Sequence, residues 1–449
     1  MKPSSSMYSD LFGFRALNQV FDERATLQGM LDFEAALARA EAVTGVIPKT
    51  AAGPIAICCK AELYDPRSIA EQSANTGNFA IPLVKLLTAQ VNGIDADAAR
   101  YVHWGATSQD VIDTGLILQL RQAFDLLDAE LASLCAILAK LADAHRTTPI
   151  AARSWMQQAI PTTLGLKFAG WLDALYRHRT RISAARTRIL VLQFGGAAGS
   201  LASIGDKGLQ VSAALSADLK LALPDLPWHT ERDRVAEAAT LFGLLAGTLG
   251  KMARDISLMA QSEVAELAEP AAPGRGGSST LPHKRNPVSC AVVLAAAMRV
   301  PGLVGTMLSA MVQEHERALG GWQAEWETLP QIVCLTGGAL HDMLRIIEGL
   351  EIYTARMLTN LETTRGLIFA ESASMLLATR LGKATAHELL EKASTKAIKD
   401  DRHLRDILQE DATVRAHFAN GDIAKLFDPL SYVGMADEFI TRAINAAKE

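Results

Sequence analysis

The chain has 449 residues, of which 49% are hydrophobic and 21% charged, proportions typical of a globular protein with an ample core. Lys and Arg number 44 against 49 Asp and Glu, a net charge of −5, so no overall field favours nucleic acid or a membrane surface as a partner. The first ten residues carry no apolar signal segment. No uncharged apolar run reaches the roughly 18 residues of a membrane span. Because the five cysteines also lack metal-type spacing, the sequence predicts a cytoplasmic protein with reduced thiols.

The first hundred residues have the pattern of short helices. Leu27, Met30 and Leu31 begin a helical apolar spacing that ends near Gly45. A second helix is expected after residues 75–78. These elements predict a small helical domain.

A short polar turn with the sequence His-Trp-Gly-Ala-Thr-Ser-Gln-Asp occupies residues 103–110. It precedes a long amphipathic helix, which we expect over about residues 110–146. Thr107, Ser108 and Asp110 are residue types that cap helices, and capping is the simplest role for them.

The segment 231–268 has the most regular apolar pattern of the chain. Its apolar residues recur at alternating intervals of four and three, which is a heptad stripe. The stripe consists of Ala238, Phe242, Leu245, Leu249, Met252, Ile256 and Met259. Gly243, Gly247 and Gly250 on the same segment would permit close approach of other helices. A single helix of this length measures about 55 Å, too long for one compact chain to cover, which predicts partner subunits.

Helical patterns also dominate the rest of the chain. One long helix is expected from near Pro161 towards Arg188, and no β pattern of useful length is visible. The predicted fold class is therefore all-α. The expected domains are an N-terminal helical domain (1–102), a central long-helix bundle domain (103–350) and a C-terminal helical domain (351–449).

One loop contrasts with the helices around it. Residues 273–287 are rich in Gly, Pro and cations, and the loop is longer than the usual helix connection of about 2–8 residues. Asn286 and Pro287 predict a helix start. The free N–H groups of that start, together with Lys284, form a predicted anion site. The alternative is a mobile basic linker.

This loop also carries the clearest resemblance to a known family. Residues 277–287, Gly-Ser-Ser-Thr-Leu-Pro-His-Lys-Arg-Asn-Pro, resemble the motif GSSxMPxKxNP of the fumarase/aspartase superfamily, with Leu281 in place of the usual Met. Residues 103–110 resemble the superfamily region HxGATSxD, and residues 153–161 resemble a third region. Within the superfamily the chain most resembles the bacterial branch that lactonises a carboxymuconate. The resemblance implies a three-domain subunit, a homotetramer, and active sites that each combine motifs from three subunits.

The resemblance also implies a chemistry. Superfamily members make or break a C–N or C–O bond beta to a carboxylate, through a carbanion whose charge spreads onto that carboxylate. Ser278 is thereby implied to move the carbon-bound proton, and Lys284 lowers the cost of its alkoxide. Lys284 and Asn286 are suited to hold the dianion. His103 is assigned to substrate binding, with acid/base work also open and a satisfied turn histidine as the alternative.

The implied substrate is a small anionic polycarboxylate, with no cofactor and no metal. The candidate residues for binding it are Asn78, Thr107, Ser108, Trp155, Gln157, Ser279, His283, Asn286 and Arg317. For Thr107 and Ser108 the alternative is helix capping. For Arg317 it is a surface ion pair with Glu314 or Glu316.

Two departures from the superfamily pattern bear on the reaction. Trp155 stands where adenylosuccinate lyase carries a histidine, and Asn78 stands where it carries another. A leaving amine needs a proton, whereas a carboxylate with a pKa of about 4 leaves without one. The predicted function is therefore a cycloisomerase that adds the substrate's own carboxylate to an alkene. The alternatives are adenylosuccinate lyase or a related C–N lyase, and a non-catalytic helical scaffold.

Overall fold

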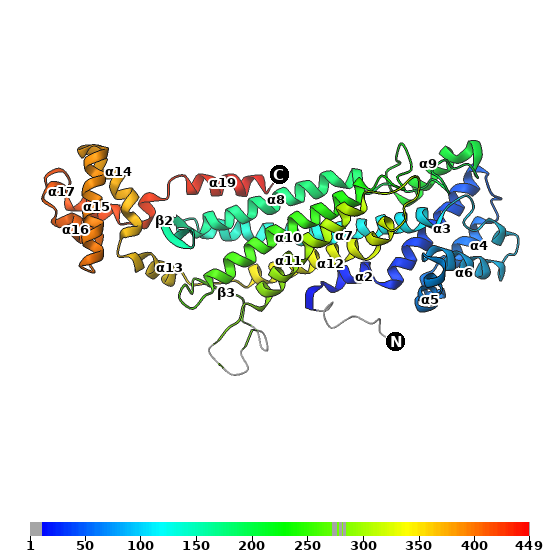
Figure 1. Cartoon of the computed structure of the whole chain (residues 1–449), viewed down its shortest axis with the longest axis horizontal. Helices are drawn as coiled ribbons and strands as arrows, with labels where there is room; N and C mark the ends of the chain where they lie inside the picture. The colour runs from blue at the N-terminus through cyan, green and yellow to red at the C-terminus, as the bar shows by residue number, and fades with distance from the viewer. Residues whose placement is uncertain (1–10, 272–275, 278–280, 282–283, 449) are drawn as a thin grey trace. The chain divides into compact units, whose positions relative to one another are not determined.

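The structure is a computed structural model, and it describes residues 11–271, 276–277, 281 and 284–448. The described chain is mostly helical (Figure 1), so the helical fold class is confirmed. The helices up to the basic loop are α2 (Arg15–Val20), α3 (Glu23–Thr44), α4 (Ala52–Cys58), α5 (Pro66–Thr76), α6 (Ala80–Asn92), α7 (Ser108–Ala144), α8 (Leu164–Ile189), α9 (Gly208–Leu219) and α10 (Asp233–Met259). Those after it are α11 (Val288–Ala310), α12 (Gly321–Glu348), α13 (Thr354–Leu361), α14 (Ala370–Leu381), α15 (Lys383–Lys399), α16 (Leu404–Glu410), α17 (Ala412–His417), α18 (Asn420–Leu426) and α19 (Ala436–Ala446).

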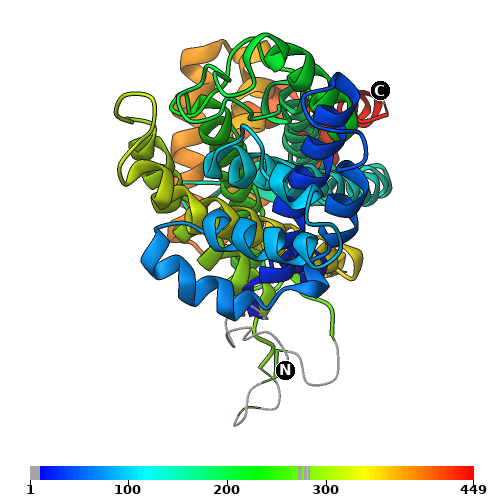
Figure 2. The same cartoon turned by 90° about the vertical axis from the view of Figure 1, so that its right-hand side faces the viewer.

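The chain divides into two compact units. Unit 1 comprises residues 1–130, 178–250 and 292–342, and unit 2 comprises residues 131–177, 251–291 and 343–449. The boundaries fall inside the five long helices α7, α8, α10, α11 and α12. The N-terminal helices of unit 1, drawn in blue, face the viewer in Figure 2.

Helix α3 shows how local sequence sets its ends. The Asp22 carboxylate accepts a hydrogen bond from the Ala25 N–H at 2.8 Å and caps the helix start. Gly45 ends the helix with a φ of 73°, a conformation that glycine adopts without strain. The predicted helix and its end at Gly45 are both confirmed. At Gly29 the helix crosses α7 so closely that a Cβ would lie 3.0 Å from the Gly115 carbonyl oxygen.

A β-hairpin replaces the start of the long helix expected at Pro161. Strands β1 (Pro149–Ser154) and β2 (Gln157–Thr163) pair antiparallel, and α8 begins only at Leu164. The prediction that no β pattern would appear is wrong here. The register shifts between Ala151 and Arg153, which breaks the strict alternation by which a strand is recognised in sequence.

The heptad helix is shorter than expected and is covered by its own chain. Helix α10 ends at Met259, so its 27 residues measure about 40 Å. All seven residues of the predicted stripe are buried, so the argument that this stripe needs partner subunits is wrong. A Cβ at Gly243 would lie 3.0 Å from Val304, and one at Gly250 would lie 2.6 Å from Ala297. Close approach of α11 is thus confirmed at these two glycines, but nothing approaches Gly247.

A buried charge triad joins three helices of unit 1. Arg232 precedes α10 and is 1% exposed. Its guanidinium donates to both oxygens of Asp113 on α7, at 2.7 and 3.0 Å, and to both oxygens of Glu325 on α12, at 3.0 and 2.5 Å. The Trp322 indole N–H also donates to Asp113. Buried charges of this kind are tolerated only when each is paired.

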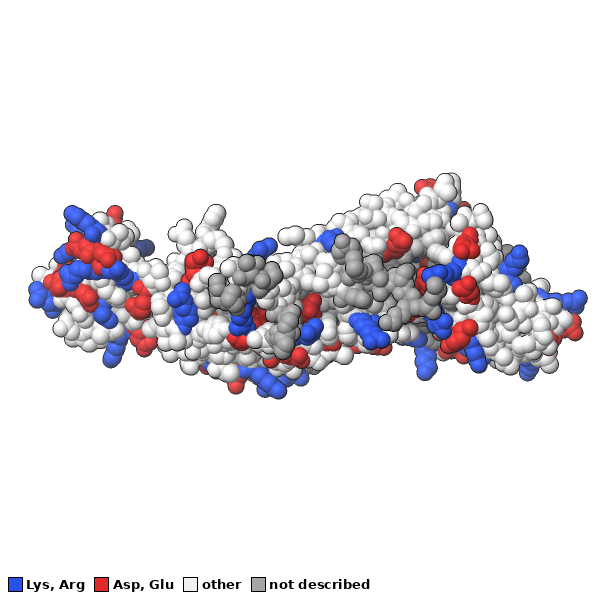
Figure 3. Space-filling view, turned by 90° about the horizontal axis from the view of Figure 1, so that it is seen from below, with Lys and Arg blue, Asp and Glu red and all other residues white. Residues whose placement is uncertain are grey.

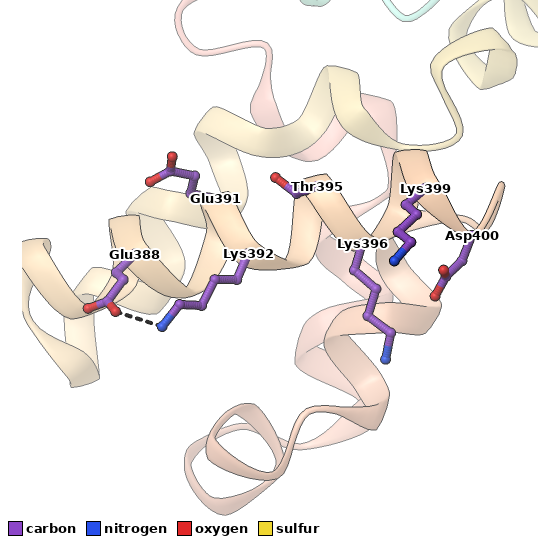
Figure 4. A pocket seen from close by; sticks show the side chains of 7 residues that line it. All are labelled: Glu388, Glu391, Lys392, Thr395, Lys396, Lys399 and Asp400. Atoms are coloured by element: carbon purple, nitrogen blue, oxygen red, sulfur yellow. Dashed lines mark hydrogen bonds and ion pairs between the residues drawn. The ribbon is translucent and has the colours of Figure 1, made fainter.

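Charges on the C-terminal helices are of a different kind. Lys and Arg alternate there with Asp and Glu over the exposed surface, as the left end of Figure 3 shows. Figure 4 shows one such pair on α15, where Lys392 and Glu388 form an ion pair of 2.6 Å. Exposed pairs of this type add little to stability because both ions remain hydrated.

Replacing Arg232 by alanine is expected to lower the free energy of unfolding by about 3–5 kcal/mol, because two buried carboxylates lose their counter-charge. Chemical denaturation of wild type and variant measures the difference. Lys392→Ala is the control, and its denaturation midpoint should match wild type. Equal midpoints for the two variants would show that the triad does not stabilise the fold.

Candidate active site

The carboxylate of Asp110 organises the region around the start of α7. Asp110 is completely buried. Its oxygens accept from the backbone N–H groups of Thr107, Gly195 and Gly196 at 2.9–3.0 Å, and from the Gln193 side chain at 3.2 Å. The Nε2 atom of His229 lies 2.8 Å from the same carboxylate. This one side chain therefore fixes the turn 103–110 against a segment more than 80 residues later.

The glycines at 195–196 have a structural role in this arrangement. Two consecutive N–H groups reach one carboxylate only where the backbone comes very close to it. A Cβ on Gly196 would lie 3.0 Å from the Gly105 carbonyl oxygen. Gly196 also has a φ of 69°. The segment is a turn that binds the Asp110 carboxylate.

Thr107 and Arg317 meet at this end of unit 1. The Arg317 guanidinium donates to the Thr107 hydroxyl at 2.8 Å and lies over the Trp322 ring, 5.9 Å from its centroid. In the described part of the chain, no carboxylate lies within ion-pair distance of Arg317. The alternative of a surface ion pair with Glu314 or Glu316 is therefore not what the structure shows. A half-buried cation whose partner is a hydroxyl suits an incoming anion.

Burial lowers the pKa of Arg317, and the nearby charges of Asp110 and Asp113 oppose this effect. Arginine begins from so high a pKa that its guanidinium stays charged. The positive charge at this position is therefore permanent. Ser108 is the first residue of α7, so it lies next to Thr107 at a helix N-terminus, where the dipole also favours negative charge.

His103 contacts a buried carboxylate rather than solvent. Its Nδ1 atom lies 2.6 Å from Oε1 of Glu34 on α3, and the His103 side chain is 19% exposed. The His103 backbone has a φ of 59°, which is rare for a residue with a large side chain. The Glu34 contact satisfies one ring nitrogen, so it agrees both with a role in substrate binding and with the alternative of a satisfied turn histidine.

Asn78 acts as a helix cap in this structure. Its side-chain oxygen accepts from the N–H groups of Ala80 and Ile81, at 3.1 and 3.2 Å, at the start of α6. The cap fixes the direction of the Asn78 side chain.

In unit 2, residues 276–277 and 285–286 bring the two sides of the basic loop together, and we call these residues the neck of the loop. Gly277 and Arg285 form an antiparallel bridge, and the Asn286 N–H donates to the Gly276 carbonyl at 2.8 Å. A Cβ on Gly276 would lie 2.8 Å from the Asn286 carbonyl oxygen. The two sides of the neck can lie this close because glycine occupies one of them.

An ion pair anchors the neck to the strand β4 (Glu351–Ile352). The Arg285 guanidinium donates to both oxygens of Glu351, at 2.8 and 2.7 Å, and to the Glu269 carbonyl at 2.7 Å. The Tyr353 hydroxyl also donates to Glu351. The hydrogen bonds from Arg285 and then Tyr353 lower the pKa of Glu351 to about 2. The anchor therefore persists at any pH near neutrality.

The start of α11 is capped by an internal carboxylate. Glu269 is 7% exposed, and its oxygens accept from the N–H groups of Ser289 and Cys290 at 3.2 and 2.7 Å. The expectation that free N–H groups of this helix start would bind a substrate anion is therefore wrong for these two groups. Glu269 already supplies the negative charge that the helix dipole favours.

The other predicted residues of unit 2 lie at two places. Lys284 and Asn286 flank Arg285 in the sequence, and Lys284 is exposed. Trp155 is 95% exposed at the tip of the hairpin, and Gln157 begins β2. Near the tip, the hairpin is held by the Arg153 guanidinium, which donates to both oxygens of the buried Glu266. Ser278, Ser279 and His283 lie outside the described residues.

Several residues of these sites were not found from the sequence. They are Glu34, Gln193, His229, Arg232, Glu269, Glu325 and Glu351. Each acts through a partner on another element, and no local motif marks it. Glu34 and Glu325 lie on buried helix faces where an acidic residue is unusual, and this is the one signal that the sequence contains.

Comparisons with known proteins agree with this picture. Residues 14–302 match the family model described as lyase, and residues 366–443 match that of the adenylosuccinate lyase C-terminus. A 3-carboxy-cis,cis-muconate cycloisomerase of Pseudomonas aeruginosa is 54% identical over 98% of this chain and 96% of its own. One of Bradyrhizobium diazoefficiens is 52% identical over 98% of each chain.

The comparison with solved structures finds the same kind of enzyme. The crystal structure of the 3-carboxy-cis,cis-muconate lactonizing enzyme from Pseudomonas putida superposes with a TM-score of 0.96, at 50% identity and over 99% of each chain. The resemblance found in three sequence motifs thus extends along nearly the whole chain. The protein belongs to the lyase family that includes the 3-carboxy-cis,cis-muconate cycloisomerases.

Proposed function

We propose that this protein is a lactonising cycloisomerase that converts 3-carboxy-cis,cis-muconate to 4-carboxymuconolactone. The observation that carries the proposal is the identity of more than half of its residues, over nearly its full length, to a protein named for this reaction. The permanent positive charge of Arg317 beside Thr107 supports a small polycarboxylate as the substrate.

The reaction needs no second reactant. One carboxylate oxygen of the substrate attacks an alkene carbon and forms the ring C–O bond. The π electrons move towards a neighbouring carboxylate, which becomes an aci-carboxylate dianion. The Ser278 hydroxyl then delivers a proton to the adjacent carbon and is reprotonated from solvent, and the lactone is an isomer of the substrate when both are written in their acid forms. Groups that stabilise the developing dianion lower the barrier most.

We assign the proton transfer to Ser278 and the charge stabilisation to Lys284, with His103 as a further catalytic group. The position of Lys284 next to the anchored Arg285 supports its role, because a cation carried on a held backbone can be directed at the developing charge. The substrate-binding roles are assigned to Asn78, Thr107, Ser108, Trp155, Gln157, Ser279, His283, Asn286 and Arg317. For Arg317→Ala, a KM that stays at the wild-type value would remove Arg317 from this set.

We also propose a three-domain subunit, with domains 1–102, 103–350 and 351–449, in a homotetramer whose active sites combine three subunits. Helix α11 supports the assembly, because it is strongly apolar yet exposes Met298 (71%) and Leu308 (47%). Exposed apolar surface of this kind marks an interaction site. Light scattering that gave the mass of a single 48.1 kDa chain would reject the tetramer.

The purified protein is expected to consume 3-carboxy-cis,cis-muconate, and this is followed by the loss of the diene absorbance. Adenylosuccinate is the comparison substrate, because part of the chain matches an adenylosuccinate lyase model. Turnover of adenylosuccinate alone would favour the C–N lyase. Turnover of neither would favour the helical scaffold.

Alanine at Ser278 or at Lys284 is expected to lower kcat by at least about 10²-fold, because one variant loses the proton carrier and the other a charge aimed at the dianion. Steady-state kinetics measure the loss, and light scattering checks that assembly is unchanged. Lys392→Ala, far along the sequence on the exposed face of α15, is the matched control. A rate near wild type for Ser278→Ala would assign the proton transfer to another group, with His103 the first to test.

A further inference from the structure

The Nδ1 side of the His103 ring contacts a carboxylate on helix α3. Oε1 of Glu34 lies 2.6 Å from Nδ1 of His103, and the Glu34 side chain is 0% exposed. The left-handed backbone of His103 needs support from its surroundings, and strain of this kind collects at functional sites. One ring nitrogen is thus committed to Glu34, and the other remains for the substrate.

We propose that Glu34 is the positioning residue of His103 in the reaction. It accepts the Nδ1–H, which fixes the ring orientation, and it holds the ring as an imidazolium that presents Nε2–H to the anionic substrate. This inference rests on the proposed function and assigns to that site a residue on α3. An imidazolium adds both a positive charge and a strong donor to a site that binds carboxylates.

The charges around the ring favour this state. Burial by itself lowers the pKa of His103, but the charge and hydrogen bond of Glu34, with the charge of Asp110 on α7, outweigh it and leave the pKa raised. His103 therefore stays protonated at pH values where a free histidine has lost its proton. The stabilisation from the pair is complete below the pKa of a free histidine, about 6.5, and disappears as the pH rises through the raised pKa.

The other acidic groups that face Glu34 do not compete with it. Glu41, two turns further along α3, is completely buried, and neither of its carboxyl oxygens has a hydrogen-bond partner among the described residues. Burial, and then the charge of Glu34, raise the pKa of Glu41 to about 9. Burial likewise raises the pKa of the Cys59 thiol, with a further contribution from Glu34. Both groups are uncharged near neutrality, so neither adds a negative charge beside Glu34.

The pair Glu34 and Glu41 supplies a matched test. Glu34→Gln keeps a hydrogen-bond acceptor but removes the charge, and it should lower kcat/KM near pH 7.5 on the order of 10²-fold. The alkaline limb of its pH profile should move to lower pH, because the imidazolium loses its counter-charge. Glu34→Asp, which keeps the charge, should recover part of the activity. Glu41→Gln replaces an already neutral group and should keep both rate and profile.

Two results would overturn the proposal. One is a Glu34→Gln profile with the same limb positions as Glu41→Gln. The other comes from the protein without substrate, by NMR titration of ¹³C-labelled histidines with the His103 signal assigned through His103→Asn. A His103 midpoint at or below about 6.5 would mean that Glu34 does not hold the imidazolium. This second measurement needs no turnover, so it remains decisive if Glu34→Gln does not fold or if the proposed substrate is wrong.

Discussion

The arrangement of the chain around the start of α7 depends on one buried carboxylate. Asp110 receives hydrogen bonds from three backbone N–H groups and lies within hydrogen-bond distance of two further side chains. A buried carboxylate without such partners would cost several kcal/mol. With them it joins the α7 turn, the glycine turn at 195–196 and His229 into one rigid body. Thr107 and Ser108 keep their positions because the turn that carries them is fixed in this way.

Internal carboxylates recur wherever a loop must be held. Glu269 caps α11, Glu351 anchors Arg285, and Glu266 binds Arg153 near the tip of the hairpin. In each case the charge is paired with backbone N–H groups or a bidentate arginine, which are the strong forms of hydrogen bond. The chain thus uses its own anions to shape loops, whereas the Arg317 guanidinium donates to a hydroxyl.

This division between internal and external anions has a chemical consequence. A cation that is already neutralised by a protein carboxylate contributes little to stabilising a dianion, because its field is compensated. Arg285 is compensated in this way by Glu351, whereas Arg317 faces a hydroxyl. The same reasoning separates the basic residues of the motif Lys284-Arg285-Asn286. The arginine holds the loop through Glu351, and the proposed action on the substrate is assigned to the lysine.

Local sequence determined the helices, because helix formation follows from spacing and capping within about ten residues. The end of α3 at Gly45 and the extent of α7 agree with what the sequence predicted. The motifs around His103, Trp155 and Lys284 also determined the family, since their residue types and order are written in the chain. The β-hairpin escaped prediction because its register shift hides the alternation that identifies strands.

Tertiary structure alone decided which partner each buried charged side chain contacts. Nothing in the sequence pairs Glu34 with His103, Asp110 with Gly195, or Glu269 with Cys290, because these partners are 69, 85 and 21 residues apart. The energy of such a pair depends on burial and on distances of a few ångströms, and the packing of whole helices sets both. For the same reason the α10 stripe, which suggested partner subunits, proved to be covered by the chain itself. The sequence therefore determined the helices and the family, and the fold decided which charged side chains are buried and which partners hold them.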